Sequence, residues 1–179
     1  ELTADMVMAS ACLPLMFQAV EIDGEAYWDG GYAGNPSLLP LITDSPADDL
    51  LLVQINPTRR DNVPTQADEI LDRAGEVTFN ASLLKELRTI GLIKELLEDA
   101  GRPDSCFRRP LFKRVDDLRL HQLDAGDQLA RLGAASKTQT NWSFLSQLHA
   151  IGRQAADGWL AQHRRDVGRR STVALPPSL

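Results

Sequence analysis

Residues 20–36 read VEIDGEAYWDGGYAGNP, and this stretch decides how the first part of the chain folds. Two short runs, 20–22 and 25–28, flank Asp23-Gly24, a dipeptide that favours a two-residue turn between antiparallel strands. The pattern predicts a β-hairpin, and it predicts that Asp29 lies just past the end of the second strand.

Asp29 is followed by Gly30 and Gly31, and two interpretations of this DGG sequence are open. In an ordinary turn, the carboxylate hydrogen-bonds the neighbouring backbone while both glycines take positive φ. In a catalytic site, the strand holds the carboxylate in place and the small neighbours let a reacting group approach it. The three residues alone do not decide between these roles.

The segment after this motif predicts a sheet covered by helices. Residues 50–55, LLLVQI, are a nearly continuous apolar run, which is typical of a strand buried on both faces. Residues 66–100 change to a helical period, in which Gly75 and Gly91 are expected to break or bend the helix. The predicted buried stripe of this helix consists of Ile70, Ala74, Val77, Ala81, Leu84, Leu87, Ile90, Ile93 and Leu97.

Other segments have simpler predictions. A short helix is expected over 3–12 with Thr3 as its cap, a basic loop over 102–114 and a strand over 115–123. The last helix is expected over 142–165, capped by Asn141, and the proline-rich tail 171–179 is expected to be frayed. The buried stripe predicted for the last helix is Leu145, Leu148, Ile151, Ala155 and Trp159.

Composition excludes several functional classes. The 179 residues carry a net charge of −6, which argues against a dedicated nucleic-acid binder. The longest apolar stretch, 6–17, is too short for a bilayer and contains a proline. Cys12 and Cys106 lack metal-ligand spacing and are expected to be small buried side chains. The three histidines, His121, His149 and His163, are scattered, so no metal site is predicted.

Several segments in this order resemble the second half of the catalytic domain of bacterial patatin-like phospholipases. They are ASACLPLMF at 9–17, the hairpin, YWDGGYAGNPSLLPLI at 27–42 and LLLVQINP at 50–57. The resemblance continues through EILDRAGEVTFNASLLKELRTI at 69–90 and WSFLSQLHAIGRQAADGWL at 142–160.

The resemblance implies an α/β fold: the second half of a three-layer α/β/α domain, with C-terminal helices. Residues 1–60 would be the C-terminal part of the catalytic core, and residues 61–179 a mainly helical region packed on the same domain.

The implied activity is hydrolysis of lipid or phospholipid esters by a Ser–Asp dyad through an acyl-enzyme, without a cofactor. Asp29 matches the dyad aspartate. Because a solvated aspartate is a poor base for an alcohol, Trp28 and Tyr32 are expected to help exclude water.

The chain departs from this family in one respect that matters for chemistry. The nucleophile of the family belongs to a GxSxG elbow, whose sharp turn needs both glycines. None of Ser10, Ser37, Ser82 and Ser143 has a glycine on both sides. We therefore expect this chain alone to be inactive and to need the N-terminal half of the same domain as its partner, since ELTADMVMASAC starts without an initiator methionine and reads as a helix already under way.

A second hypothesis remains open, in which the chain is a non-catalytic domain that binds lipid or protein. A cytoplasmic location is expected. The basic residues of 102–114 and of 164–170 fit either peripheral contact with anionic membrane headgroups or solvated loop charge.

Overall fold

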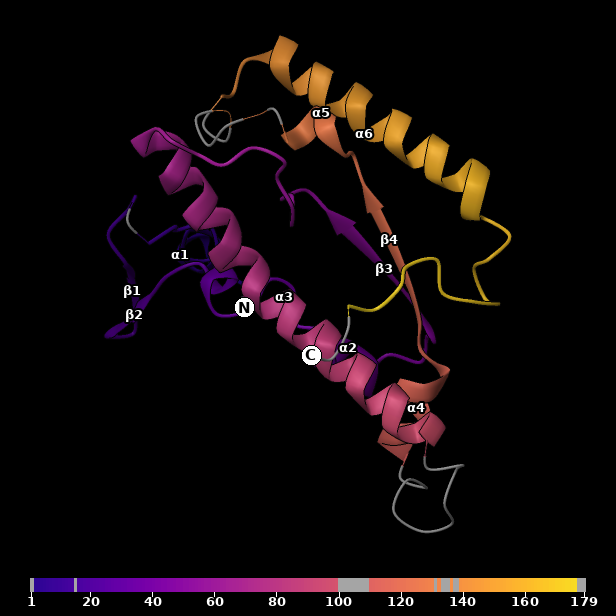
Figure 1. Cartoon of the computed structure of the whole chain (residues 1–179). Coiled ribbons are helices and arrows are strands. Elements are labelled where there is room, and N and C mark those ends of the chain that lie inside the picture. Colours follow the sequence, from indigo (N-terminus) through magenta and orange to yellow (C-terminus); the bar gives the residue numbers. More distant parts are fainter. Residues whose placement is uncertain are drawn as a thin grey trace.

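The computed structural model describes residues 2–14, 16–99, 110–130, 132, 136 and 139–176 (Figure 1). It is a mixed α/β structure with helices toward the C-terminus, as predicted. Its elements are α1 (Ala4–Ala9), β1 (Val20–Ile22), β2 (Glu25–Tyr27), the 3-10 turn η1 (Gly30–Tyr32), α2 (Leu39–Asp44), β3 (Asp49–Gln54), α3 (Ala67–Asp99), α4 (Pro110–Asp117), β4 (Arg119–Asp124), α5 (Asp127–Ala130) and α6 (Trp142–His163).

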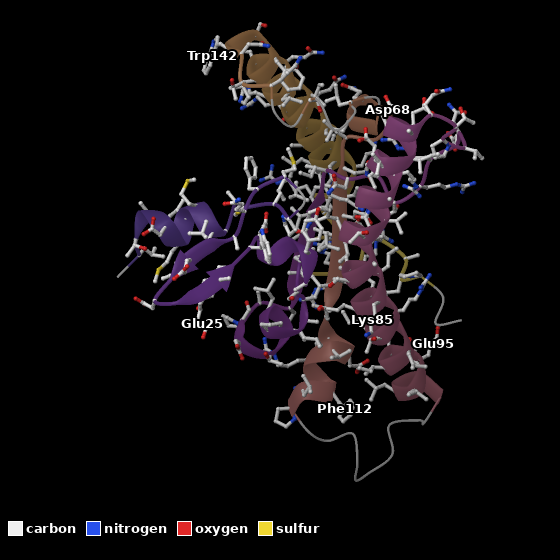
Figure 2. The ribbon with its side chains drawn as sticks, turned by 90° about the vertical axis from the view of Figure 1, so that its left-hand side faces the viewer. Glu25, Asp68, Lys85, Glu95, Phe112 and Trp142 are labelled. Atoms are coloured by element: carbon white, nitrogen blue, oxygen red, sulfur yellow. The ribbon has the colours of Figure 1, made fainter. Side chains whose placement is uncertain are left out.

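The N-terminal hairpin is confirmed. Strands β1 and β2 pair antiparallel, with Val20 opposite Tyr27. Asp23 and Gly24 have φ angles of 53° and 83°, the positive values that a two-residue turn of this kind requires. Figure 2 shows the hairpin tip, marked by Glu25, projecting away from α3. The helix before it is capped by Thr3 as predicted, because its Oγ1 accepts a hydrogen bond from the Met6 amide, although the helix ends at Ala9 rather than at residue 12.

The central sheet joins two segments that are about seventy residues apart in the chain. β3 and β4 are parallel and in register from Asp49–Arg119 to Gln54–Asp124. α3 and α4 form the connection between them, and α3 runs along one face of the pair (Figure 1). The core lies between this face and the helices; its buried residues are Leu38, Ile42, Leu52, Leu83, Leu87, Ile90, Val115, Leu118 and Leu120.

Two strand predictions need correction. The predicted strand 115–123 begins only at Arg119, because Val115 is fully buried in the core on the apolar side of α4. The strand at 50–55 is not buried on both faces. Leu52 faces the core and is 7% exposed, whereas Leu51, Val53 and Ile55 are 45%, 66% and 69% exposed. Helix α6 contacts β4, and within the described part of the chain no element covers this second face of β3.

Helix α3 is continuous through both glycines, so the predicted break is wrong. The predicted stripe holds only in its C-terminal half, where Leu87, Ile90 and Leu97 are buried. In the N-terminal half, Ile70 and Val77 are half exposed, and the buried positions are instead Glu76, Asn80 and Leu83. The buried positions differ from the predicted ones because the first turns of α3 pack on the polar loop that follows β3.

The C-terminal tail is ordered as far as it is described, contrary to the prediction of a frayed end. The Thr172 amide donates to the Leu120 carbonyl over 2.9 Å, and the Leu120 amide donates to Ser171 Oγ over 3.1 Å. Val173 and Leu175 pack against the core. The tail therefore covers the outer edge of β4 and satisfies backbone groups that an edge strand leaves unpaired.

Helix α6 begins as predicted, because the Phe144 amide donates to the Asn141 side chain over 2.8 Å. It ends at His163. Its predicted stripe is not fully buried: Leu145 is 42% exposed, and the other four members are half-buried. Residues 102–109, including Cys106, lie outside the described residues, and 110–114 belong to α4 rather than to a loop.

Among the described helices, none combines the length and the apolar character needed to cross a bilayer.

Candidate functional site

Asp29 is held at the exit of the hairpin by backbone and side-chain contacts. Its amide donates to the Cys12 carbonyl over 2.8 Å, which ties the motif to the end of the first helical segment. Its Oδ1 accepts a hydrogen bond of 2.8 Å from the Gly31 amide and caps the single 3-10 turn η1. The carboxyl group is half-buried. Among the described residues, Oδ2 has no hydrogen-bond partner, so one oxygen is anchored and the other remains available.

The two glycines of the motif have different surroundings. Neither has a positive φ, so this part of the ordinary-turn interpretation is wrong and the chain instead forms η1. The hydrogen bond from the backbone to the Asp29 carboxylate, which the same interpretation expected, is present. A Cβ on Gly30 would meet no atom within 4 Å. A Cβ on Gly31 would lie 3.0 Å from Cε1 of Phe79 and 3.1 Å from Asp29 Oδ1. Gly31 is therefore required by close packing between the carboxylate and α3, and not by backbone conformation.

The two aromatic neighbours of Asp29 make different contacts. The Trp28 indole Nε1 donates to the Phe17 carbonyl over 3.1 Å, and this side chain is 50% exposed. The Tyr32 ring packs edge-on against Phe79, with ring centroids 4.8 Å apart, and is 37% exposed. Tyr32 thus fastens η1 to α3, whereas Trp28 is fastened to the segment before the hairpin.

Residues 34–39, which follow the DGG motif, also lie close to α3. Asn35 and Pro36 are joined by a cis peptide bond. A Cβ on Gly34 would lie 2.6 Å from Ser37 Oγ and 3.6 Å from Ser82 Oγ. The Glu86 carboxylate of α3 accepts hydrogen bonds from the amides of residues 38 and 39 and so caps α2. The sequence did not reveal this cap, because 47 residues separate the partners.

The part of α3 that packs on the DGG motif also contacts the loop after β3. Phe79 touches Gly31, and its chain neighbour Asn80 donates from Nδ2 to the Pro57 carbonyl over 3.0 Å. Pro57 follows the carboxyl end of β3. The crevice beyond the carboxyl ends of parallel strands is the usual ligand site of an open α/β sheet.

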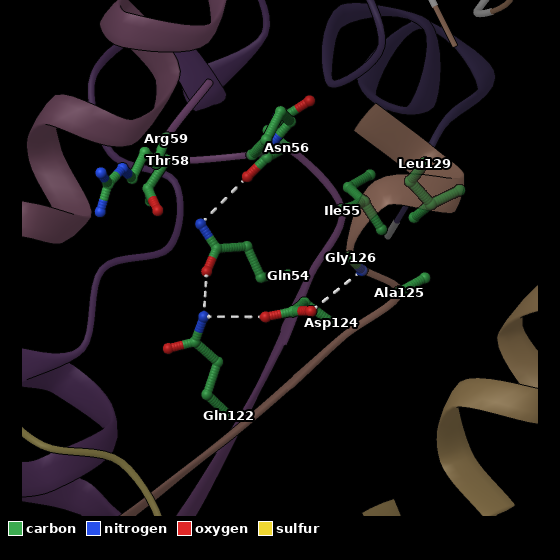
Figure 3. A pocket seen from close by; sticks show the side chains of 11 residues that line it. Gln54, Ile55, Asn56, Thr58, Arg59, Gln122, Asp124, Ala125, Gly126 and Leu129 are labelled. Atoms are coloured by element: carbon green, nitrogen blue, oxygen red, sulfur yellow. Dashed lines mark hydrogen bonds between the residues drawn. The ribbon is translucent and has the colours of Figure 1, made fainter. Parts of the chain in front are cut away.

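Pockets surround the same strand ends. A polar pocket of about 170 Å³ is shown in Figure 3. In it Gln122 Nε2 donates to Gln54 Oε1 over 2.6 Å, and Gln54 Nε2 donates to the Asn56 carbonyl over 3.0 Å. A groove of about 330 Å³ lies along β3 and is also lined by Asn35 and Pro36. These pockets could not be predicted from the sequence, because they combine residues from distant segments.

A buried histidine forms a second polar cluster that the sequence analysis missed. His121 Nε2 lies 2.9 Å from Asp49 Oδ1, and its Nδ1 lies 3.1 Å from Thr172 Oγ1. Asp49 also accepts hydrogen bonds from the Gly168 amide and from Arg119. The Arg119 hydrogen bond is the main reason that the pKa of Asp49 is well below its usual value. This cluster fastens the C-terminal tail to the start of the sheet, at the opposite end of β3 from Pro57.

A third charged cluster anchors the loop after β3. Arg60 and Arg73 both bind the Glu76 carboxylate, Arg60 Nη2 at 2.5 Å and Arg73 Nη1 at 3.0 Å. Burial raises the pKa of Glu76, but the two arginines outweigh burial and leave the pKa below its usual value. Arg73 also donates to the carbonyls of Pro57 and Thr58. The described residues contain no group of three or more His, Cys, Asp or Glu side chains placed to hold a metal ion.

Comparison with known proteins bears on the hairpin and its motif. Residues 1–42, which include Asp29, Gly30 and Gly31, match the family model described as patatin-like phospholipase. This segment is well under half of the chain, and the match supports a relationship of the N-terminal segment to lipid hydrolases. Neither the curated proteins nor the solved structures contain a match to this chain.

Proposed function

We propose that this chain supplies the aspartate of a Ser–Asp dyad that hydrolyses lipid esters. The observation that carries the proposal is the state of Asp29: one carboxylate oxygen is anchored by the Gly31 amide, and the other has no partner among the described residues. The motif lies within the segment that matches the patatin-like phospholipase model. The serine comes from a segment outside these 179 residues, which contain no GxSxG sequence.

The chemistry assigned to Asp29 is proton transfer. The serine Oγ attacks the ester carbonyl while its proton moves to Asp29 Oδ2, and Asp29 then gives this proton to the departing alkoxide. A water molecule next attacks the acyl-enzyme, its proton passes to Asp29, and the serine recovers a proton as the fatty acid leaves. Each half-reaction returns the carboxylate to its ionised state. Such a base contributes about 10²- to 10⁴-fold to the rate.

The test is Asp29→Asn in a polypeptide that also carries the elbow serine, assayed on a short-chain ester. The asparagine carbonyl oxygen still accepts from the Gly31 amide, so the fold should be retained while kcat falls by about 10²-fold or more. Asp23→Asn is the matched control, since Asp23 lies in the hairpin turn at φ 53°, which asparagine tolerates. If Asp29→Asn keeps full turnover, Asp29 is not the base.

A second candidate function is supported by the uncovered face of β3. Leu51, Val53 and Ile55 are largely exposed along a strand whose outer edge has no partner among the described residues. An apolar strand edge of this kind favours pairing with another polypeptide. In this alternative the chain is a non-catalytic domain that binds protein through β3, and Asp29→Asn would leave that binding unchanged.

A further inference from the structure

An apolar pocket of about 320 Å³ lies beyond the segment matched to the lipid hydrolase family. It is formed by the loop after β3, the first turns of α3, α5, residues 132 and 136, and the first half of α6. Its apolar wall consists of Ile55, Leu129, Leu132, Phe144, Leu148 and Ile151. Ligand pockets of this size are mostly lined by apolar side chains with a few polar groups.

The charges around this pocket select an uncharged ligand. The acidic residues that line it are Asp72 and Glu76, and the Glu76 carboxylate is already bound by Arg60 and Arg73. Among the described lining residues there is no lysine or arginine that would meet an anionic headgroup. A free carboxylate inside the pocket would therefore lose its hydration without gaining a cationic partner from the lining, which is unfavourable.

The pocket is connected to the candidate catalytic site through shared walls. Ile55 and Asn56 line both this pocket and the groove along β3. Asn35 and Pro36, which follow the DGG motif in the chain, also line the groove. The groove and the pocket therefore adjoin at Ile55 and Asn56, and a long molecule could occupy both.

We propose that this pocket binds a single uncharged alkyl chain, and that this chain is the acyl group of the ester hydrolysed at Asp29. The binding of an alkyl chain follows from the pocket itself. Its assignment to the substrate rests on the proposed function. The C-terminal helix α6 then takes part in selecting the length of the acyl chain.

Two glycines of α6 provide a matched pair of variants. A Cβ on Gly152 and a Cβ on Gly158 would each meet no atom within 4 Å, so either position accepts a side chain. Both substitutions to leucine improve helix propensity by a similar amount. Gly152 lines the pocket and Gly158 does not, so Gly152→Leu fills the pocket and Gly158→Leu leaves it open.

Binding is measured by titrating the intact protein with 1-butanol, 1-hexanol and 1-octanol while recording methyl NMR signals of Ile55, Leu148 and Ile151. Each added methylene that enters the pocket should strengthen binding about fourfold. Gly152→Leu should weaken 1-octanol binding about tenfold or more, and Gly158→Leu should bind as the wild type does. Equal affinity in the two variants would overturn the proposal.

A second experiment tests the pocket proposal independently of the Ser–Asp dyad proposal. Asp29→Asn should bind 1-octanol as tightly as the wild type, so loss of catalysis does not affect this readout. In the polypeptide with the elbow serine, Gly152→Leu should shift the preference among acyl esters toward shorter chains. If alkanol binding weakens but the preference does not shift, the pocket does not hold the acyl chain of the substrate and that assignment is wrong.

Discussion

A methyl group added at Gly31 should disturb the Asp29 carboxylate, whereas the same methyl group at Gly30 should not. The Cβ of Gly31→Ala would lie 3.0 Å from Phe79 Cε1 and 3.1 Å from Asp29 Oδ1. Carbon atoms in contact prefer separations of about 3.5–4.0 Å, so the ring and the carboxylate must together move by about half an ångström. The Cβ of Gly30→Ala meets nothing within 4 Å.

This displacement should lower the free energy of unfolding only modestly and should lower kcat more strongly. Overpacking of this kind costs about 1–3 kcal/mol, and the lower end applies because Gly31 is only half-buried. A misplacement of about 1 Å in a catalytic group can reduce a rate about 10²-fold, so a shift of half that size predicts a loss of about tenfold in kcat. Because neither glycine requires positive φ, alanine adds no backbone strain at either position.

The assay measures kcat on a short-chain ester and the urea unfolding free energy for both alanine variants, again in the polypeptide that carries the elbow serine. Phe79→Leu removes the ring atom nearest to the new methyl group, and in the double variant with Gly31→Ala it should restore part of the lost activity. Similar kcat values for Gly30→Ala and Gly31→Ala would refute the argument that Gly31 positions the carboxylate.

Two other predictions concern the sheet. Because Arg119 holds the pKa of Asp49 below its ordinary value, Asp49 stabilises the fold above about pH 4, and this stability is lost as the pH falls further. Asp49→Asn should lower the free energy of unfolding by about 1–3 kcal/mol near neutral pH. The variant should also lose less of this free energy than the wild type as the pH falls below about 4. The same loss of stability at acid pH in both proteins would contradict this role. Val53→Lys should reduce self-association or partner binding in sedimentation experiments by charging the exposed edge of β3, whereas Val7→Lys, at a residue 61% exposed on α1, should not. Equal association of the two lysine variants would contradict the role of the β3 edge.

Short-range features of this protein were predictable from neighbouring residues. The Asp23-Gly24 turn, the Thr3 cap and the Asn141 cap all appear where they were predicted. Each depends on residues at most a few positions apart, so local backbone preference and one hydrogen bond are sufficient. The candidate role of Asp29 was also predictable, but only from its resemblance to a family, and it remains a proposal.

Long-range features required the folded chain. The buried positions at the start of α3 are Glu76 and Asn80, because the loop after β3 supplies Arg60 and the Pro57 carbonyl as partners. No periodicity of apolar residues indicates such partners. In the same way, burial of His121 depends on Asp49 and Thr172, whose segments lie far apart in the chain.

The sequence by itself therefore determined the hairpin turn, the starts of α1 and α6, and which residue types stand at the DGG motif. The tertiary structure decided that β3 pairs with β4, that the tail covers the edge of β4, and that Gly31 lies between Asp29 and Phe79. The physical reason is the range of the interactions. Local hydrogen bonds depend on adjacent residues, whereas burial and pairing depend on which distant surfaces exclude water together.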